Sequence, residues 1–410
     1  MNCRHCHNEL THVFVDLINC PPSNSMIKKE ELNAPEIYYP LKVFVCDECY
    51  LVQVDEMKRA EEIFSDEYTY FSSYSTSWLA HAKRYAEMMI DRFGFDKESQ
   101  VIEIASNDGY LLQYFKERNV PVLGIDPTEN TAAVAMEKGI ETIVDFFGSD
   151  FAESKLVEKG IKGDLILGNN VLAHVPDIND FVKGMKLALS DEGVVTMEFP
   201  HLYQLVKHCQ FDTIYHEHFS YLSFSTVKRI FERQGLELFD VDEIPTHGGS
   251  LRIYAKHKTD ETKSVSENVS NLLEKEAQAG MLTLDYYLDF QGRVDKIKYD
   301  LWSFLLQQKK DGKKVIAYGA AAKGNTLLNY CGVKGSDLIA FAVDASPHKQ
   351  EKYLPGSRIL VRGIESIKPY KPDYVIIFPW NLREEIQNQH AYIREWGGQF
   401  VVFIPNIQIF

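Results

Sequence analysis

The chain has 410 residues, which is enough for two or three domains of ordinary size. Hydrophobic residues make up 45% of it, and no apolar run approaches the roughly 20 residues that cross a bilayer, so neither a disordered nor a membrane protein is expected. The net charge of −15 argues against nucleic-acid binding, which needs basic groups that neutralise phosphates. Without the apolar stretch of a secretory signal, we expect a cytoplasmic protein with no obligate protein partner.

The amino-terminal part, residues 1–65, contains two Cys-x-x-Cys pairs, formed by Cys3, Cys6, Cys46 and Cys49. In a cytosolic chain this spacing indicates a metal before a disulfide, because two such pairs can hold one tetrahedral Zn²⁺. Four thiolates fill the coordination sphere, so the zinc is expected to be structural. The alternatives are that His5 or His7 replaces a thiolate, or that the cysteines form a redox dithiol.

Residues 68–78 are rich in aromatic and hydroxyl side chains, and an amphipathic helix is predicted over 78–93. Aromatic rings and hydroxyls together are typical of a pocket wall that faces a sugar or a cofactor. A plain aromatic cluster beneath the helix is the alternative.

Residues 101–127 follow the order strand, turn, helix, strand, acid of nucleoside-binding α/β folds. The first strand runs into a turn of small residues that ends at Gly109, and Asp126 ends the second strand, where a carboxylate suits ribose hydroxyls. The turn lacks Gly-x-Gly-x-x-Gly, and Glu103 and Asp108 lie where a dinucleotide would place its phosphates. The pattern therefore favours a cationic ligand without phosphates, such as S-adenosylmethionine.

Three further strand segments, expected at 142–147, 163–175 and 193–200, complete the sheet of a class I methyltransferase. Asp145 and Phe146 should lie near the adenine, and the fourth strand leads into the site at Asn169 and His174. A helix-cap or core position is the alternative for His174. The expected cofactor-binding residues are Glu103, Ala105, Asn107, Asp108, Gly109, Asp126, Pro127, Asp145, Phe146 and Asn169.

Proton-transfer groups are concentrated in the run Tyr215, His216, Glu217 and His218. Histidine titrates near neutral pH, and an adjacent carboxylate can raise its basicity. The run follows the fifth strand, so it should lie at the carboxyl end of the sheet, where α/β folds bind ligands. A base there could remove a proton from a ketone-activated carbon that then attacks a methyl group. Partly buried histidines at a helix start are the alternative, and the loop 245–252 could cover the substrate or form a hairpin corner.

The remaining residues, 257–410, begin with polar linker sequence and an amphipathic helix over 286–310, followed by a second strand-turn-helix fold. Its Gly-Ala-Ala-Ala-Lys-Gly turn, 319–324, can approach a phosphate closely, and a helix N-terminus favours anions. An inert lobe is the alternative to a nucleotide site. The expected substrate-binding residues are Tyr318, Ala320, Lys323, Asn325, Asp344, Lys349, Pro379, Trp380 and Asn381.

These motifs, in this order, resemble the three-domain C-methyltransferases that act on nucleotide-linked deoxysugars. The resemblance covers nearly the whole chain and is most specific at 215–218 and 319–324. It implies an α/β protein with a zinc-binding domain (1–65), a central class I S-adenosylmethionine methyltransferase domain of Rossmann-like fold (66–256), and a helical linker with a Rossmann-like nucleotide-sugar-binding domain (257–410).

The resemblance also implies a reaction. A base removes the C3 proton of a 4-keto-6-deoxysugar carried on a dTDP- or GDP-type nucleotide, the keto oxygen holds the enolate charge, and C3 takes the methyl group of S-adenosylmethionine. His218 matches the position of the base, with Glu217 beside it, and Tyr215 and His174 match assisting positions. C5 methylation, methylation of a small oxygen or nitrogen acceptor, and a non-catalytic binding module are the alternatives.

A tyrosine of the 68–78 segment also lines this pocket in the family that the chain resembles. Among the three tyrosines of the segment we choose Tyr70 over Tyr68 and Tyr74. The expected catalytic residues are therefore His218, Tyr215, Glu217, His174 and Tyr70.

Overall fold

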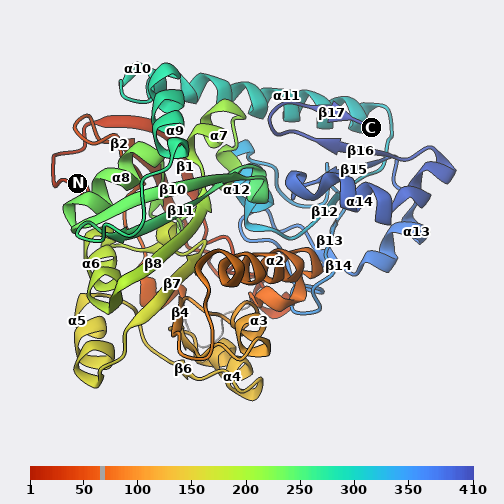
Figure 1. Ribbon diagram of the computed structural model, residues 1–410. Helices are drawn as coiled ribbons and strands as arrows, with labels where there is room; N and C mark the ends of the chain where they lie inside the picture. The colour runs from red at the N-terminus through yellow and green to blue at the C-terminus, as the bar shows by residue number, and fades with distance from the viewer. Residues whose placement is uncertain (65–69) are drawn as a thin grey trace.

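The computed structural model describes residues 1–64 and 70–410, and Tyr68 lies outside them. Its amino-terminal part forms an antiparallel four-stranded sheet in the order β1-β2-β3-β9, of which β1 and β2 are labelled in the red part of the chain in Figure 1. The strands are β1 (His12–Cys20), β2 (Tyr39–Val45), β3 (Val52–Val54) and β9 (Ser220–Tyr221). The last strand comes from far along the chain, directly after the Tyr-His-Glu-His run, so that run is attached to the amino-terminal sheet.

The middle part contains a seven-stranded sheet in the order β10-β11-β8-β7-β4-β5-β6. The five strands from β6 to β8 are parallel, as predicted, and β11 and β10 extend the sheet antiparallel. Its strands are β4 (Val101–Ile104), β5 (Val122–Ile125), β6 (Thr142–Ile143), β7 (Gly163–Asn169), β8 (Leu189–Pro200), β10 (Leu236–Ile244) and β11 (Ser250–His257). The order reverses between β4 and β7, and ligands bind at such a point in open α/β sheets.

Helices cover this sheet. They are α2 (Thr76–Phe93), α3 (Leu112–Glu117), α4 (Glu129–Glu137), α5 (Ser149–Phe151), α6 (Ile178–Ala188), α7 (Leu202–Lys207) and α8 (Phe224–Arg233). Helix α2 begins two residues before the predicted start, because the Ser75 hydroxyl accepts a hydrogen bond from the Trp78 amide and caps the first turn. Strand β6 is shorter than predicted, and Asp145 and Phe146 lie beyond it on exposed chain.

The carboxyl-terminal part contains a six-stranded sheet in the order β14-β13-β12-β15-β16-β17, parallel except for its last strand. Its strands are β12 (Val315–Tyr318), β13 (Ala342–Val343), β14 (Val361–Arg362), β15 (Tyr374–Ile377), β16 (Gln399–Val402) and β17 (Gln408–Ile409). Its helices are α12 (Ala322–Cys331), α13 (Ile367–Tyr370) and α14 (Arg383–Gln389). The strand order reverses between β12 and β15.

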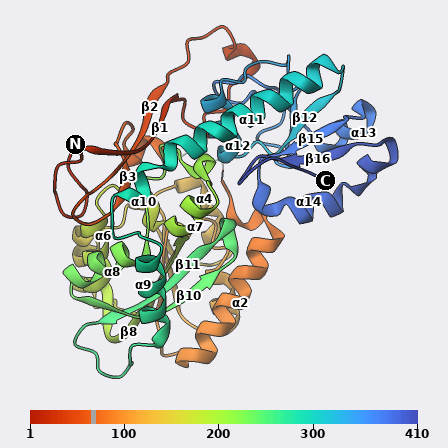
Figure 2. The same ribbon diagram turned by 90° about the horizontal axis from the view of Figure 1, so that it is seen from above.

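A helical connection joins the two larger sheets. It comprises α9 (Glu267–Gln278), α10 (Asp285–Leu288) and α11 (Phe290–Lys310), while α1 (Ala60–Ile63) belongs to the amino-terminal part. Helix α11 runs from the region of β1 to the carboxyl-terminal sheet (Figure 2). The single helix predicted over 286–310 is interrupted at Asp289, but its predicted apolar positions are all buried: Phe290, Val294, Ile297, Leu301, Phe304 and Leu305.

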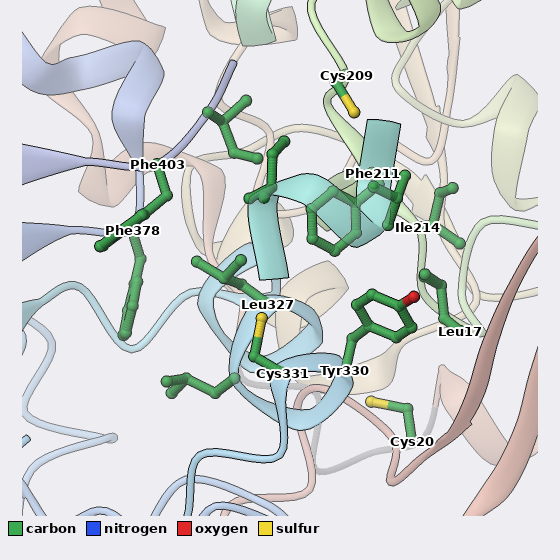
Figure 3. Packing of buried hydrophobic residues seen from close by; sticks show 14 of the residues in the cluster. Leu17, Cys20, Cys209, Phe211, Ile214, Leu327, Tyr330, Cys331, Phe378 and Phe403 are labelled. Atoms are coloured by element: carbon green, nitrogen blue, oxygen red, sulfur yellow. The ribbon is translucent and has the colours of Figure 1, made fainter. Parts of the chain in front are cut away.

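One apolar core unites the three parts of the chain (Figure 3). It brings together side chains of β1, of the segment that precedes the Tyr-His-Glu-His run, of α12, and of the chain that follows β15 and β16. The labelled members are Leu17, Cys20, Cys209, Phe211, Ile214, Leu327, Tyr330, Cys331, Phe378 and Phe403. Burial raises the pKa of each of the three thiols to about 12, so they act as small apolar residues rather than nucleophiles.

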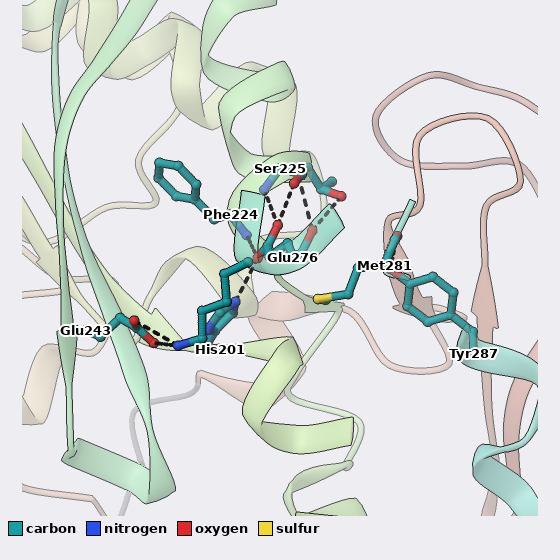
Figure 4. A network of polar contacts seen from close by, with 10 residues as sticks. His201, Phe224, Ser225, Glu243, Glu276, Met281 and Tyr287 are labelled. Atoms are coloured by element: carbon teal, nitrogen blue, oxygen red, sulfur yellow. Dashed lines mark hydrogen bonds and ion pairs between the residues drawn. The ribbon is translucent and has the colours of Figure 1, made fainter. Parts of the chain in front are cut away.

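A buried ionic network fixes α9 to the middle part (Figure 4). The Glu276 carboxylate is fully buried, lies 2.7 Å from the His201 imidazole, and accepts hydrogen bonds from the Phe224 and Ser225 amides at the start of α8. Burial alone would raise the Glu276 pKa, but the hydrogen bonds from His201 and Ser225 outweigh it and lower the pKa. The network is therefore built around a charged carboxylate.

Replacing Glu276 by alanine should lower the free energy of unfolding by about 3–5 kcal/mol, because His201 and two helix amides lose their buried partner. Since the folded-state pKa of Glu276 is depressed, its contribution is present above the unfolded-state pKa and disappears as the pH falls. Urea unfolding between pH 4 and 7 measures both effects. The neighbouring Lys275, in an exposed pair with Glu243, is the matched control, and its alanine variant should change stability by less than about 1 kcal/mol.

Candidate active site

A single cavity of about 550 Å³ is lined by residues from all three parts of the chain. It opens at the carboxyl ends of β4 and β7, where the order of the middle sheet reverses. The Tyr-His-Glu-His run and the turn after β12 contribute further walls. A volume of this size lies within the usual range of small-molecule binding pockets.

The turn after β4 has the geometry of a nucleoside site. Ala105 and Asn107 adopt left-handed backbone conformations, with φ of 58° and 49°. The Asp126 carboxylate accepts a hydrogen bond from the Asn107 amide at 2.8 Å and another from the Thr128 amide at 3.0 Å. At Gly109, with φ of 72°, a Cβ would lie 2.6 Å from the Ile140 side chain. The turn is therefore fixed tightly against the end of β5.

Seven of the ten expected cofactor-binding residues line the cavity: Ala105, Asn107, Asp126, Pro127, Asp145, Phe146 and Asn169. Glu103, Asp108 and Gly109 lie behind the turn. Asp108 is 1% exposed and pairs with Lys138 at 3.5 Å, so its carboxylate supports the turn from within.

Glu103 is fully buried beneath this turn, and neither carboxyl oxygen has a hydrogen-bond partner among the described residues. Burial, together with the nearby Asp126 and Asp108 carboxylates, raises its pKa well above the ordinary range. Glu103 is thus held neutral, and the carboxylates that reach the cavity wall here are those of Asp126 and Asp145, which fit a cationic ligand such as S-adenosylmethionine better than a phosphate. Asp126 and Asn107 would hold its nucleoside.

All five expected catalytic residues line the cavity: Tyr70, His174, Tyr215, Glu217 and His218. The His218 ring lies with its centroid 4.1 Å from that of Tyr215 and 4.6 Å from that of His174. His218 Nδ1 donates a hydrogen bond to the Thr213 carbonyl at 2.9 Å. In the neutral ring, Nε2 then keeps its lone pair and can accept a proton.

Burial is the main cause of the shifted pKa values in this cluster. It lowers the pKa of His218 well below the ordinary value, with the neighbouring His174 adding to the effect, and it lowers the pKa of His174 to about 4. The sequence suggested instead that Glu217 raises the basicity of its neighbour. In the structure Glu217 accepts a hydrogen bond from Asn24 at 2.7 Å, and burial raises its own pKa. His218 is thus neutral at pH 7.

His216 is separated from this cluster. Its Nε2 lies 3.1 Å from the Pro40 carbonyl, and its ring packs against Tyr39. The run of four residues therefore divides into three side chains that line the cavity and one that holds the loop against β2.

Two of the nine expected substrate-binding residues, Lys323 and Lys349, line the cavity. Lys323 Nζ lies 2.9 Å from the Asn381 amide oxygen and 4.4 Å from the centre of the Trp380 ring. Burial lowers its pKa to about 8, although the nearby Asp212 carboxylate opposes the shift. Seven expected residues do not line it: Tyr318, Ala320, Asn325, Asp344, Pro379, Trp380 and Asn381.

Local contacts explain several of these positions. The Tyr318 hydroxyl is 3.2 Å from His390, inside the carboxyl-terminal part. Asp344 accepts a hydrogen bond from the Ala320 amide at 2.7 Å and so fixes the turn after β12, as Asp126 fixes the turn after β4. Trp380 and Asn381 support Lys323 from behind.

Sequence reasoning missed several residues of the cavity wall. Asn170 and His247 have left-handed backbones, with φ of 57° and 53°, and the Asn170 amide donates to His247 Nε2 at 3.1 Å. Trp78, from the aromatic segment 68–78 that was expected to form a pocket wall, lines the cavity and packs edge-on against His247. The loop 245–252 was noted as a cover for the substrate, but no role was assigned to His247 within it. Asn24 also lines the cavity, and it was not among the expected site residues.

The four paired cysteines form a compact cluster. Their sulfur atoms all lie within 4.8 Å of one another, with Cys3 to Cys49 at 3.5 Å and Cys6 to Cys46 at 3.4 Å. A tetrahedron of thiolates around Zn²⁺ has edges of about 3.8 Å, so the arrangement fits a structural zinc ion. The cluster lies away from the cavity, and neither His5 nor His7 belongs to it.

The parallel sheet, the tight turn and the acid after the second strand are those of a nucleoside-binding α/β fold, and the family model that matches this part makes it a methyltransferase that uses S-adenosylmethionine. Three family models match consecutive parts of the chain: "Putative zinc binding domain" at 3–64, "Methyltransferase domain" at 78–241 and "C-methyltransferase C-terminal domain" at 245–405. The chain is 32% identical over 407 residues to the C-methyltransferase NovU of Streptomyces niveus, covering 99% of this chain and 96% of that protein. The protein belongs to this family of three-domain C-methyltransferases.

Solved structures resemble part of the chain at low identity. An S-adenosylmethionine-dependent methyltransferase from Clostridium acetobutylicum ATCC 824 matches with 11% identity and a TM-score of 0.36, over 44% of this chain and 92% of that one. The PH0226 protein of Pyrococcus horikoshii OT3 matches with 14% identity and a TM-score of 0.38, over 46% and 95%. Within the described residues, no helix combines the length and apolarity that a bilayer crossing requires.

Proposed function

We propose that the protein transfers a methyl group to C3 of a 4-keto-6-deoxysugar linked to a dTDP- or GDP-type nucleotide. The observation that carries this proposal is the division of charge within one cavity. The wall from the middle sheet carries Asp126 and Asp145, which suit a cationic methyl donor, and the wall from the carboxyl-terminal part carries Lys323 and Lys349, which suit a diphosphate. His218 lies in the same cavity, where it can remove the proton that must leave the sugar before methyl transfer.

In the proposed mechanism, His218 Nε2 accepts the proton of C3 as the C–H bond breaks, and the electron pair moves to the 4-keto oxygen as an enolate. Tyr215 and His174, against the base, stabilise that oxygen by hydrogen bonding. Bound S-adenosylmethionine supplies the methyl group to C3. The proton on His218 then returns to solvent.

Omitting the methyl donor allows removal of the C3 proton to be measured separately from methyl transfer. Incubating the enzyme in D₂O with a 4-keto-6-deoxy nucleotide sugar and no donor should exchange the C3 proton for deuterium, as NMR would detect. Addition of S-adenosylmethionine should then yield a C3-methylated sugar and S-adenosylhomocysteine in equal amounts. Exchange at C5 in place of C3, or methylation of an oxygen, would contradict the proposal.

Lys323 gives a pH dependence to substrate binding. Because its pKa is about 8, it loses its charge as the pH rises through that value, and KM for the nucleotide sugar should increase between pH 7 and 9.5. Lys323→Met should raise KM at pH 7 by about tenfold, the effect of one charged hydrogen bond. Lys323→Arg should remove the rise above pH 8, since arginine stays charged. Lys368→Met, at a lysine packed on Tyr392 outside the cavity, is the control and should change neither value.

A further inference from the structure

The ring of the base is held in place by a hydrogen bond to the main chain. His218 Nδ1 donates to the carbonyl of Thr213, and that bond decides which ring nitrogen keeps the lone pair. Thr213 ends the short turn Phe211–Thr213, which belongs to the middle part by sequence. The position of this carbonyl therefore controls both the orientation and the tautomer of the base.

The residues before and after Thr213 in the sequence both form hydrogen bonds with the carboxyl-terminal part. The Trp380 indole N–H donates to the Asp212 carboxylate at 2.8 Å, and the Thr326 hydroxyl donates to the Ile214 carbonyl at 2.8 Å. Asp212, Ile214 and Thr326 are at most 1% exposed, so the bond from Thr326 is shielded from water and the bond from Trp380, which is itself half-buried, is partly shielded. Helix α12, which carries Thr326, also packs directly on the 211–213 turn.

The same contacts reach the proposed diphosphate site. Lys323 Nζ lies over the Trp380 ring, and Trp380 bonds Asp212, the residue before Thr213. A continuous chain of contacts thus runs from the lysine through Trp380 and Asp212 to the carbonyl that holds His218. Coupling of this kind is carried by packed side chains and hydrogen bonds between rigid elements.

We propose that Thr326 and Trp380 are positioning residues for the base: by holding Ile214 and Asp212, the carboxyl-terminal part aims His218 Nε2 at the substrate. This proposal rests on the function proposed above. It gives that part of the chain a role in proton abstraction as well as in binding the nucleotide. Neither residue lines the cavity, so each acts through the main chain and not through the substrate.

Thr326→Val removes the hydroxyl without changing the shape of the side chain, and Thr326→Ser keeps the hydroxyl. We expect Thr326→Val to lower kcat and the C3 deuterium exchange rate by about three- to tenfold, the value of one hydrogen bond, with KM for the sugar and affinity for S-adenosylmethionine unchanged. Thr326→Ser should restore most of the rate. Thr283→Val, which loses an equivalent hydroxyl-to-carbonyl bond in the helical connection, should behave like wild type.

Trp380→Phe provides a second variant, because it keeps a ring beneath Lys323 and loses the N–H donor. It should lower the exchange rate by a similar factor. Equal rates for Thr326→Val, Thr326→Ser and wild type, with Trp380→Phe also unchanged, would overturn the positioning role. A fall in thermal stability with kcat unchanged would overturn it as well.

A measurement without substrate separates this proposal from the proposed function. In full-length protein labelled with ¹⁵N-histidine, the His218 signals, assigned by their loss in His218→Ala, should report a proton on Nδ1. Thr326→Val combined with Trp380→Phe should move part of the population to the Nε2–H tautomer. An unchanged tautomer would refute the positioning role even if C3 exchange is observed, and a changed tautomer would support it even if the substrate is a different ketone.

Discussion

Replacing His218 by asparagine should lower turnover by about 10²–10⁴-fold, the contribution of a positioned general base. Asparagine keeps a donor where Nδ1 bonds the Thr213 carbonyl, so the loop should retain its conformation. It has no group that corresponds to Nε2. Deuterium exchange at C3 should fall by the same factor as methyl transfer, because both require removal of that proton. Affinity for S-adenosylhomocysteine, measured by calorimetry, should not change.

The matched control lies two residues away. His216 is a histidine of the same run whose ring faces Pro40 and Tyr39, outside the cavity. His216→Gln keeps a donor for the Pro40 carbonyl and should retain nearly full activity. Equal losses in the two variants would mean that the run acts as a structural unit, and the assignment of His218 as the base would then be wrong.

The pH profile gives an independent check on the base. Since burial places the His218 pKa well below its ordinary value, the neutral ring persists under mildly acidic conditions. The acidic limb of kcat/KM for C3 exchange should therefore lie below pH 6 in the wild type. An acidic limb with its midpoint at about 6.5, the ordinary histidine pKa, would contradict the assignment of a buried histidine as the base.

Much of the fold follows from local sequence, because apolar periodicity and cysteine spacing act over short distances. The buried strand β4, the turn that leads to Gly109 and the acid at Asp126 were all predicted, and the structure places the turn and the acid in contact at the end of the sheet. The apolar face of α11 was predicted residue by residue. In each case the determining contacts lie within one supersecondary unit.

Features that depend on contacts between distant segments were not predictable in this way. Ser220 and Tyr221 add the fourth strand to the amino-terminal sheet. A strand of two residues is too short to show the alternation of apolar and polar side chains that indicates a strand in a sequence. The different orientations of the His216 and His218 side chains likewise depend on the distant segments that each side chain contacts. Asn24 bonds Glu217 across 193 residues of sequence, and a single polar residue in a loop carries no signal for such a partner.

Because of those same long-range contacts, we expect catalysis to depend on the zinc cluster, although none of its four cysteines lines the cavity. We expect Cys46→Ser to abolish stoichiometric zinc binding and to reduce methyl transfer by more than about tenfold. Structural zinc contributes apparent binding free energies of about 10–16 kcal/mol, comparable with the whole stability of a domain at about 5–15 kcal/mol. Loss of the ion should therefore unfold the sheet that β9 completes, and with it release the loop that carries Glu217 and His218.

Zinc content by mass spectrometry and amide hydrogen exchange test this directly. Protection should be lost at Val52–Val54 and Ser220–Tyr221 together, because β3 and β9 pair, while β4 and β5 keep theirs. Cys20→Ala is the matched control: this thiol is buried in the core that the three parts share and lies outside the zinc cluster, so the variant should keep its zinc and its activity. Full activity in a zinc-free Cys46→Ser enzyme would show that the loop is held by the carboxyl-terminal part alone, through Thr326 and Trp380.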